Sequence, residues 1–553
     1  MKATFLRWRY KFVLTLILLA VLGLFSRIIY LAIFEQSFLR KEGNQRTLRV
    51  VNSPAFRGTI FDRSGFPLAV SSIVDSIWIN PQEWHANQSL VQVSQLLGLN
   101  KAQLQAQLIR AKAKHREFVY LKRGVAPHLA KKITALHIAG IYSQEEFKRF
   151  YPEGEITAHV IGFTNVDDAG QEGLEAAYNH VLQGTPGKKL VLKDRLGNIL
   201  SEVEVIQAQK PGEDIVLSID RQIQYLAYKA LLDTVNTYNA RSGMAVVIDT
   251  TTGEILALVN QPSFNPNDRS NYPIENYRNR AATDIFEPGS TIKSFTVAAA
   301  LEGKFIQADA IIDTSPGWMR LDKSVVKDEH NNGPLSLAQI LQKSSNMGAS
   351  KIVLSMPANR LRETLAAVGF GADTGASFPG ESYGILHAPP KWGDFTLATL
   401  SFGYGMSATL LQLARAYNTF AHQGRLLPLS VLRRDTAPSS VGVFSPETAA
   451  TMLNLLETVV NEGTGKKARI KGYRIAGKTG TVLIAGAGGY KNNHYNASFV
   501  GIGPVSEPRL LVAVIVQDLE GKYHSGTNVA APLFANIMQG ALRILNVAPD
   551  KNS

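Results

Sequence analysis

The sequence contains no cysteine. This absence excludes disulfide bonds, thiolate nucleophiles and the cysteine-rich sites that bind zinc or iron–sulfur clusters. The eleven histidines are scattered and form no HExxH pair, so no metal site is expected. Long repeats and low-complexity tracts are also missing. The hydrophobic content of 45% instead predicts a packed globular core.

The charge is basic but diffuse. The net charge is +13, and Lys2, Arg7, Arg9 and Lys11 supply four of these charges within residues 1–11, which contain no acidic residue. The rest of the excess forms no basic run with interleaved aromatic residues, so nucleic acid is not an expected partner. A diffuse positive charge suits anionic lipid headgroups or acidic glycan peptides.

Residues 12–34 form a long apolar segment, broken only by Thr15, Ser26 and Arg27. As a helix this segment is about 35 Å long, enough to cross a hydrocarbon core of about 30 Å. Arg27 lies past the midpoint, where its long side chain can reach the far interface. The sequence therefore predicts a single transmembrane anchor.

The basic residues before this segment predict that residues 1–11 lie in the cytoplasm and that everything after residue 34 lies outside. A cleaved signal peptide is the rival interpretation, but no small-x-small cleavage site follows the apolar run. A buried core helix fits poorly with the basic flank.

The length of 553 residues predicts more than one domain beyond the anchor. Residues 35–212 show mixed short strands and helices, and Lys210-Pro211-Gly212 marks a boundary to a second domain at 213–553. The second domain is predicted to be α/β (α+β), with a mostly antiparallel sheet faced by helices. The predicted elements are strand–turn–strand at 51–70, helical structure across 90–136, a helix at 221–238, strands at 244–249, 254–259, 498–505 and 509–517, and a helix at 529–545.

The first reactive pattern is Ser290-Thr291-Ile292-Lys293, at the start of a predicted apolar helix. Residues three apart lie on the same face of a helix, so the lysine amine reaches the serine hydroxyl. A serine becomes a nucleophile when a neighbouring base accepts its proton. Lysine acts as that base if burial and a nearby cation lower its pKa. Alone, this spacing is more often a helix cap followed by a surface lysine.

The second pattern is Ser344-Ser345-Asn346, which alone is most often a turn or helix cap. In the functional interpretation, Ser344 relays a proton, and Asn346 binds a substrate carbonyl and fixes Lys293.

The third pattern is Lys478-Thr479-Gly480-Thr481. Residues 472–479 also match the phosphate-binding pattern G-x-x-x-x-G-K-[ST], but a phosphate loop opens a helix, and the glycine-rich residues 482–490 are unsuited to one. The favoured alternative is a strand on which Gly480 lets another backbone approach closely. A substrate peptide would pair along this strand, with Lys478 and Thr479 binding its carboxylate.

Together and in this order, the three patterns resemble those of the penicillin-binding proteins and serine β-lactamases. The resemblance implies that these residues form one active site that needs no cofactor. The implied roles are Ser290 as nucleophile, Lys293 as general base, Ser344 and Asn346 in proton transfer and substrate positioning, Lys478, Thr479 and Gly480 along the substrate carboxylate, and the N–H groups of Ser290 and Thr481 as the oxyanion hole.

Residues 57–65 (RGTIFDRSG) resemble a signature of the class B penicillin-binding proteins, and residues 149–152 and 170–175 resemble two further motifs of their pedestal domain. Other stretches look like the division-specific type of this class. These stretches are 159–166, 286–293, 342–346 and 401–405. Two features depart from the family: Ser294 replaces a common proline, and the loop at 482–495 is glycine-rich.

The resemblance implies a septal D,D-transpeptidase in the bacterial inner membrane that cross-links peptidoglycan stem peptides and is acylated by β-lactams. A membrane glycosyltransferase and other division proteins are the implied partners. The alternatives are an elongation-type transpeptidase, a D,D-carboxypeptidase, a β-lactamase, a β-lactam sensor and a catalytically dead scaffold. Glu381 is in the general region of a β-lactamase's deacylating glutamate, but its surroundings do not resemble that loop.

Overall fold

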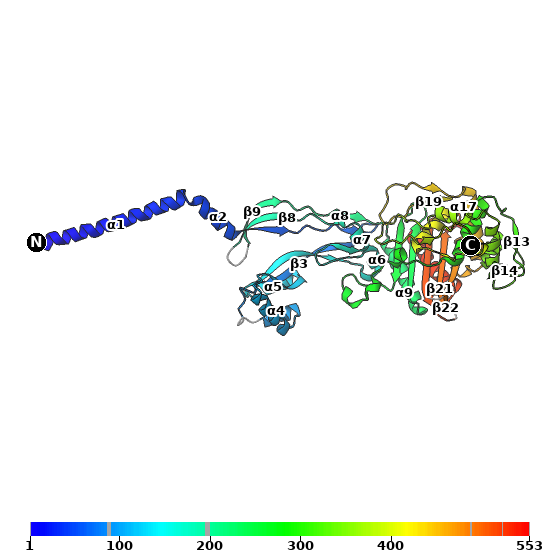
Figure 1. Ribbon diagram of the computed structural model, residues 1–553, viewed down its shortest axis with the longest axis horizontal. Helices are drawn as coiled ribbons and strands as arrows, with labels where there is room; N and C mark the ends of the chain where they lie inside the picture. Colours follow the sequence, from blue (N-terminus) through cyan, green and yellow to red (C-terminus); the bar gives the residue numbers. More distant parts are fainter. Residues whose placement is uncertain (1, 86–89, 194–198, 487–488, 522–523, 552–553) are drawn as a thin grey trace. The chain divides into compact units, whose positions relative to one another are not determined.

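The computed structural model describes residues 2–85, 90–193, 199–486, 489–521 and 524–551 (Figure 1). The chain forms two compact units. The first unit comprises Met1–Phe56, Ile73–Phe147 and Gly184–Gly212, and the second comprises Arg57–Ser72, Lys148–Gln183 and Glu213–Ser553.

Helix α1 (Lys2–Ile33) contains the predicted apolar segment. Its stretch Arg7–Ile33 is long and apolar enough to cross a membrane, and none of its most apolar window is buried against the protein. The alternative of a buried core helix is therefore wrong. The apolar helix instead indicates single-pass membrane anchoring.

The described part of the first unit also holds two groups of strands and, after α1, four short helices. Strands β1, β8 and β9 form one antiparallel sheet, and the later part of β3 pairs with β4. Ile77 and Ile79 of β3 pack with Leu108 and Ile133 of the helices in one core. The elements are α2 (Gln36–Thr47), β1 (Leu48–Ser53), β3 (Pro67–Ile79), α3 (Val91–Leu97), α4 (Lys101–Ala113), β4 (Val119–Val125), α5 (Pro127–Thr134), β5 (Ile141–Phe150), β8 (Gly187–Lys193) and β9 (Ile199–Gln207).

The second unit is built on a five-stranded sheet in which every neighbouring pair is antiparallel. Its order is β12 (Ile255–Gln261), β11 (Ser242–Asp249), β23 (Leu510–Leu519), β22 (Gly489–Gly503) and β21 (Ala476–Gly486). Strands near both ends of this unit thus lie side by side (Figure 1). The predicted antiparallel sheet faced by helices is confirmed.

Helices cover both faces of this sheet. Successive side chains of a strand point to opposite faces of the sheet, so the side chains of β11 pack alternately in two different cores. Ala245 and Val247 pack in the core with helices α9 (Arg221–Thr237) and α18 (Ala531–Ile544). Val246 and Ile248 pack in the other core, with helices α10 (Arg280–Thr283), α11 (Lys293–Glu302) and α16 (Leu410–Ala421). Because both faces are buried, the strand is apolar from Met244 to Ile248.

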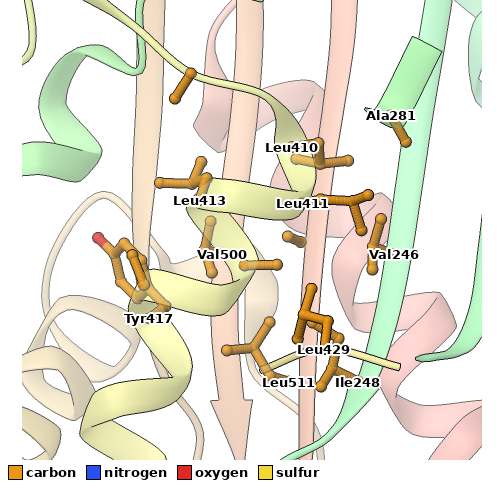
Figure 2. Close-up of a cluster of buried hydrophobic side chains, with 14 of the residues drawn as sticks. Val246, Ile248, Ala281, Leu410, Leu411, Leu413, Tyr417, Leu429, Val500 and Leu511 are labelled. Atoms are coloured by element: carbon orange, nitrogen blue, oxygen red, sulfur yellow. The ribbon is translucent and has the colours of Figure 1, made fainter. Parts of the chain in front are cut away.

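Helix α16 packs on the same face of the sheet as α11, the helix that begins at Lys293. Figure 2 shows Leu410, Leu411 and Leu413 of this helix against Val246 of β11 and Val500 of β22. The helices around this core also include α12 (Leu337–Lys343), α13 (Asn346–Leu354), α14 (Arg360–Ala367), α15 (Asp394–Ser401) and α17 (Pro446–Asn461).

A buried ion-pair cluster joins distant segments of the second unit. Nε of Arg57 and Nε of Arg149 each lie 2.6 Å from a carboxylate oxygen of Glu175. The Arg57 guanidinium also donates to Asn179 and to two backbone carbonyls. Arg57, Arg149 and Glu175 belong to the three stretches that resemble pedestal motifs, which are 57–65, 149–152 and 170–175. The ion pairs therefore hold these stretches in contact.

Two expectations from the sequence need correction. The region 90–136 is not wholly helical, because strand β4 separates α4 from α5 and pairs with the distant β3. The segment 482–495 is not a loop: its described residues extend β21 and begin β22. Residues 487–488 lie outside the described part of the chain.

Candidate active site

Ser290 lies on a 3₁₀ turn, η4 (Gly289–Ile292), directly before α11. Gly289 enters this turn with a φ of +57°, a conformation that glycine adopts at low cost. Ser290 is half-buried, whereas Lys293 is fully buried. Nζ of Lys293 lies 2.9 Å from Oγ of Ser290. The predicted hydroxyl–amine contact is therefore present, although Ser290 precedes the α-helix instead of lying in its first turn.

Ser344 and Asn346 lie where α12 ends and α13 begins. Ser344 ends α12 in the left-handed region, with a φ of +57°, and Asn346 is the first residue of α13. Nζ of Lys293 donates to the Ser344 carbonyl at 2.6 Å and to Oδ1 of Asn346 at 2.7 Å. The Ser344 hydroxyl is 3.1 Å from the same Nζ. The break between the helices thus places three oxygen atoms around the amine.

Lys478 reaches this group from strand β21 and is fully buried. Its Nζ donates to Oγ of Ser344 at 3.1 Å. The Ser344 hydroxyl therefore lies between two lysine amines. Because Lys478 sits within a strand that continues to Gly486, the phosphate-loop alternative is wrong.

Both lysine amines have lowered pKa values. Burial lowers the pKa of Lys478 to about 7. Burial also lowers the pKa of Lys293 well below its ordinary value, and the neighbouring Lys478 lowers it further. The carboxylates of Asp328 and Glu329 oppose this shift by raising it. Lowering the pKa of a lysine favours its neutral form, which is able to accept a proton.

Strand β21 packs directly against the turn that carries Ser290. A Cβ atom on Gly480 would lie 3.3 Å from the Pro288 carbonyl oxygen and only 2.3 Å from Oγ of Ser498, so a larger residue there would force Ser498 to shift. Thr481 follows, and its Oγ1 accepts a hydrogen bond from the N–H of Gly526 at 2.9 Å. In the part of the chain that the structure describes, β21 is an edge strand of its sheet, and an edge strand is the kind of element to which a peptide adds as a further strand.

Two further residues contact this group and were not identified from the sequence. Asp328 accepts hydrogen bonds from the backbone N–H groups of Asn346 and Met347, at 2.6 and 3.0 Å. The Thr464 hydroxyl lies 2.8 Å from the Thr479 hydroxyl. Neither Asp328 nor Thr464 lies at a fixed spacing from one of the three motifs, so the sequence pattern did not identify them as site residues.

The surroundings of Glu381 also differ from those of a deacylating glutamate. Oε1 of Glu381 accepts hydrogen bonds from the backbone N–H and the hydroxyl of Thr374. These contacts fix the carboxylate within a turn. Among the described residues, no cluster of three or more histidines or carboxylates has the geometry to hold a metal ion.

Comparison with known families gives two matches along the chain. Residues 243–539 match the penicillin binding protein transpeptidase domain, and residues 52–217 match the penicillin-binding protein dimerisation domain. The first match alone covers more than half of the chain and contains all three patterns. The chain belongs to the class B penicillin-binding proteins.

Relatives of this family member align over nearly its whole length. The peptidoglycan D,D-transpeptidase FtsI of Escherichia coli K12 is 41% identical over 99% of this chain and 94% of its own. The probable peptidoglycan D,D-transpeptidase PbpC of Pseudomonas aeruginosa is 39% identical over 98% of this chain and 96% of its own.

Solved structures are also similar. A peptidoglycan synthetase from Bifidobacterium adolescentis has a TM-score of 0.73 at 25% identity, covering 92% of this chain and 98% of its own. Penicillin-binding protein 3 of Mycobacterium tuberculosis in complex with aztreonam has a TM-score of 0.70 at 26% identity, covering 91% of this chain and 98% of its own. The fold predicted for a penicillin-binding protein is confirmed.

Proposed function

We propose that this protein is a peptidoglycan D,D-transpeptidase that cross-links stem peptides through an acyl-serine intermediate. The observation that supports this function most strongly is the chain of contacts from Ser290 through Lys293 and Ser344 to Lys478, in which no step exceeds 3.1 Å. A hydroxyl beside a buried amine of lowered pKa is an activated nucleophile.

In the first half-reaction, Oγ of Ser290 attacks the carbonyl carbon of the penultimate D-alanine. Neutral Lys293 accepts the hydroxyl proton as the oxygen–carbon bond forms. The N–H groups of Ser290 and Thr481 stabilise the oxyanion. The carbon–nitrogen bond then breaks, and the terminal D-alanine leaves with a proton delivered through the Ser344 hydroxyl.

In the second half-reaction, an amine from a neighbouring stem peptide attacks the acyl-serine. The amine loses a proton to Lys293 or Ser344, an amide forms, and Ser290 regains its proton. Lys478 and Thr479 hold the carboxylate of the donor peptide, which pairs along the edge of β21 next to Gly480. A β-lactam acylates Ser290 by the same route. No metal or organic cofactor takes part.

The setting of the reaction follows from the anchor and the relatives. Helix α1 holds the chain in the bacterial inner membrane, with residues 1–11 in the cytoplasm and the chain after residue 34 in the periplasm. The similarity to FtsI of Escherichia coli supports a role in septal wall synthesis. A membrane glycosyltransferase that polymerises the glycan, together with other division proteins, is the expected partner. The domain boundaries are proposed at residues 11, 34 and 212.

Turnover of stem peptides tests this function. Full-length protein in detergent is given a donor pentapeptide and an amine acceptor, and both released D-alanine and the cross-linked product are measured. Wild-type protein forms both products. Ser290→Ala forms neither, and Ser355→Ala, which changes an exposed serine of the same unit, retains both. D-Alanine release without cross-linking would indicate a D,D-carboxypeptidase.

A further inference from the structure

Positive charge is concentrated in one stretch of the first unit. Residues 101–132 contain nine lysines and arginines but a single acidic residue, Glu117. The excess positive charge is therefore less diffuse than the whole sequence indicated. The stretch comprises α4, β4, the connection between them and most of α5. The nine basic residues are Lys101, Arg110, Lys112, Lys114, Arg116, Lys122, Arg123, Lys131 and Lys132.

Three of these basic residues have a structural role within the unit. Nζ of Lys112 donates a hydrogen bond to the Trp84 carbonyl at 2.8 Å. Nζ of Lys122 donates to another backbone carbonyl at 2.6 Å. Arg123 forms an ion pair with Glu146 at 3.0 Å. These contacts satisfy carbonyl and carboxylate oxygens of the same unit, so they account for these three charges.

A cavity of about 350 Å³ lies along α4, where the chain turns into β4. Arg110, Lys114 and Arg116 line it, together with the amide groups of Gln103 and Gln107. All five side chains are exposed. In the described part of the chain, the three basic side chains make no hydrogen bond or ion pair, and no carboxylate lines the cavity. The cavity therefore presents three cations to the solvent without a protein partner.

The end of helix α4 explains only part of this charge. The carbonyl groups at a helix C-terminus carry about half an elementary negative charge, which cations in the last turn complement. Arg110 and Lys112 lie in the last turn of α4. Lys114 and Arg116 follow it and add two further positive charges. The cluster exceeds what the helix end requires, so an external anion would bind there favourably.

An apolar stripe runs beside the polar side chains on the surface of α4. Residues three or four positions apart lie on one face of a helix. The polar stripe consists of Gln103, Gln107, Arg110 and Lys114, and the apolar stripe consists of Ala102, Ala106, Ile109 and Ala113. All eight residues are exposed, and Ile109 is 60% exposed. Cations beside exposed apolar side chains are typical of a helix that lies at a membrane interface.

The membrane anchor belongs to the same compact unit as α4. Because α1 indicates membrane anchoring, this unit is tethered to a lipid surface, and tethering raises the effective concentration of headgroups around it. Soluble acidic glycan peptides would match the cations of the cavity but not the apolar stripe. The observations therefore favour a lipid surface as the anionic partner.

We propose that the exposed face of α4 and its cavity bind the headgroups of anionic phospholipids in the membrane that holds α1. Arg110, Lys114 and Arg116 bind the phosphate groups, and Ile109 reaches the boundary between headgroups and acyl chains. The contact gives the first unit a second attachment to the bilayer. It goes beyond the proposed reaction, because it uses no residue of the Ser290 site.

The absence of cysteine allows a single reporter to be placed on this face. Full-length protein carrying Ala113→Cys, an exposed position outside the cavity lining, is labelled with bimane and reconstituted in nanodiscs whose lipids carry a quencher at headgroup level. Quenching is compared between discs of phosphatidylcholine alone and discs that also contain phosphatidylglycerol. We expect at least twofold stronger quenching in the anionic discs. High salt should remove the difference, because it screens charges at an exposed surface.

Charge variants in the same reporter protein test which residues make the contact. Each cation near an anionic surface strengthens binding about fivefold, so Arg110→Gln, Lys114→Gln and Arg116→Gln together should weaken it about 100-fold and remove the difference. The matched control removes the same charge from exposed positions of the second unit and should retain the difference. It combines Arg320→Gln, Lys323→Gln and Arg543→Gln. An unchanged melting temperature shows that each variant is folded.

Three results would overturn the inference. The first is equal quenching, or none, in the two kinds of disc. The second is an undiminished difference in the variant that lacks the three cavity cations. The third is calorimetric binding of soluble acidic glycan peptides that this variant loses, with quenching independent of lipid charge. That third result would assign the surface to the wall polymer instead of the membrane.

Discussion

Replacing Asp328 with asparagine removes the carboxylate that holds the start of α13 in place. Oδ1 of Asp328 accepts from the backbone N–H groups of Asn346 and Met347, and its Oδ2 accepts from the Ser345 hydroxyl at 2.5 Å. Asn346 in turn places its Oδ1 2.7 Å from Nζ of Lys293. Asp328 is therefore a positioning residue that acts on the proposed general base through Asn346.

The size of the effect follows from these contacts. A hydrogen bond to a charged group contributes about 1.5–3 kcal/mol, and a neutral one about 0.5–1.5 kcal/mol. Asparagine retains one carbonyl oxygen for the two N–H groups but presents an amide NH₂ group to Ser345. The segment then loses about 1.5–3 kcal/mol of stabilisation. If this loss falls on the transition state, acylation slows by about 10- to 150-fold.

The assay is the second-order rate constant of acylation by a fluorescent penicillin, measured across pH. Burial and Lys478 lower the pKa of Lys293, whereas Asp328 and Glu329 raise it. Removing either carboxylate lowers that pKa further, so Lys293 stays neutral, and acylation persists, to a lower pH. Glu329→Gln is the matched control, because this exposed residue makes no hydrogen bond in the described structure.

Asp328→Asn is expected to shift the acidic side of the pH profile of the acylation rate constant to lower pH and to lower the maximal rate constant. Glu329→Gln is expected to cause the same shift without lowering the maximal rate constant. A plateau rate for Asp328→Asn within twofold of the wild type would refute the positioning role.

Two further substitutions test the stability side of the structure. Glu175→Gln leaves Arg57 and Arg149 buried without a carboxylate, which should lower the free energy of unfolding by about 3–5 kcal/mol in a denaturant titration; an unchanged midpoint would contradict the buried ion pairs. Lys478→Met should abolish acylation yet raise the melting temperature at pH 7–8, because burial lowers the Lys478 pKa from 10.5 to about 7. Between these values the unfolded chain binds a proton that the folded chain does not, so wild-type stability rises with pH across this window. The variant should lose that rise, and a parallel pH profile would contradict the burial.

The elements best predicted from the sequence are those with a strong local signal. Strands β11 and β12 each contain a run of five consecutive apolar residues because both faces of their sheet are buried, and helix α9 shows the periodicity of an amphipathic helix. The spacing of Ser290 and Lys293 is likewise local, so their contact follows from one turn of chain. Predicting that Lys478 lies close to Ser290 required the family resemblance, because no local sequence pattern relates residue 478 to residue 290.

What the sequence did not predict depends on contacts between distant segments. Strand β4 lies between two helices and pairs with β3, whose residues come about forty positions earlier. Asp328 sits between β15 (Ser324–Lys327) and β16 (Pro334–Ser336), where no spacing rule relates it to Asn346. These features become visible only once the chain is folded.

The central claim is that Ser290, activated by the buried Lys293, forms the acyl-enzyme. The most direct test is mass spectrometry of the full-length protein after reaction with benzylpenicillin, followed by proteolysis and mapping of the modified peptide. One penicilloyl adduct is expected on the peptide that contains Ser290, and no adduct is expected in Ser290→Ala. An adduct on another residue, or one that persists in Ser290→Ala, would contradict the account.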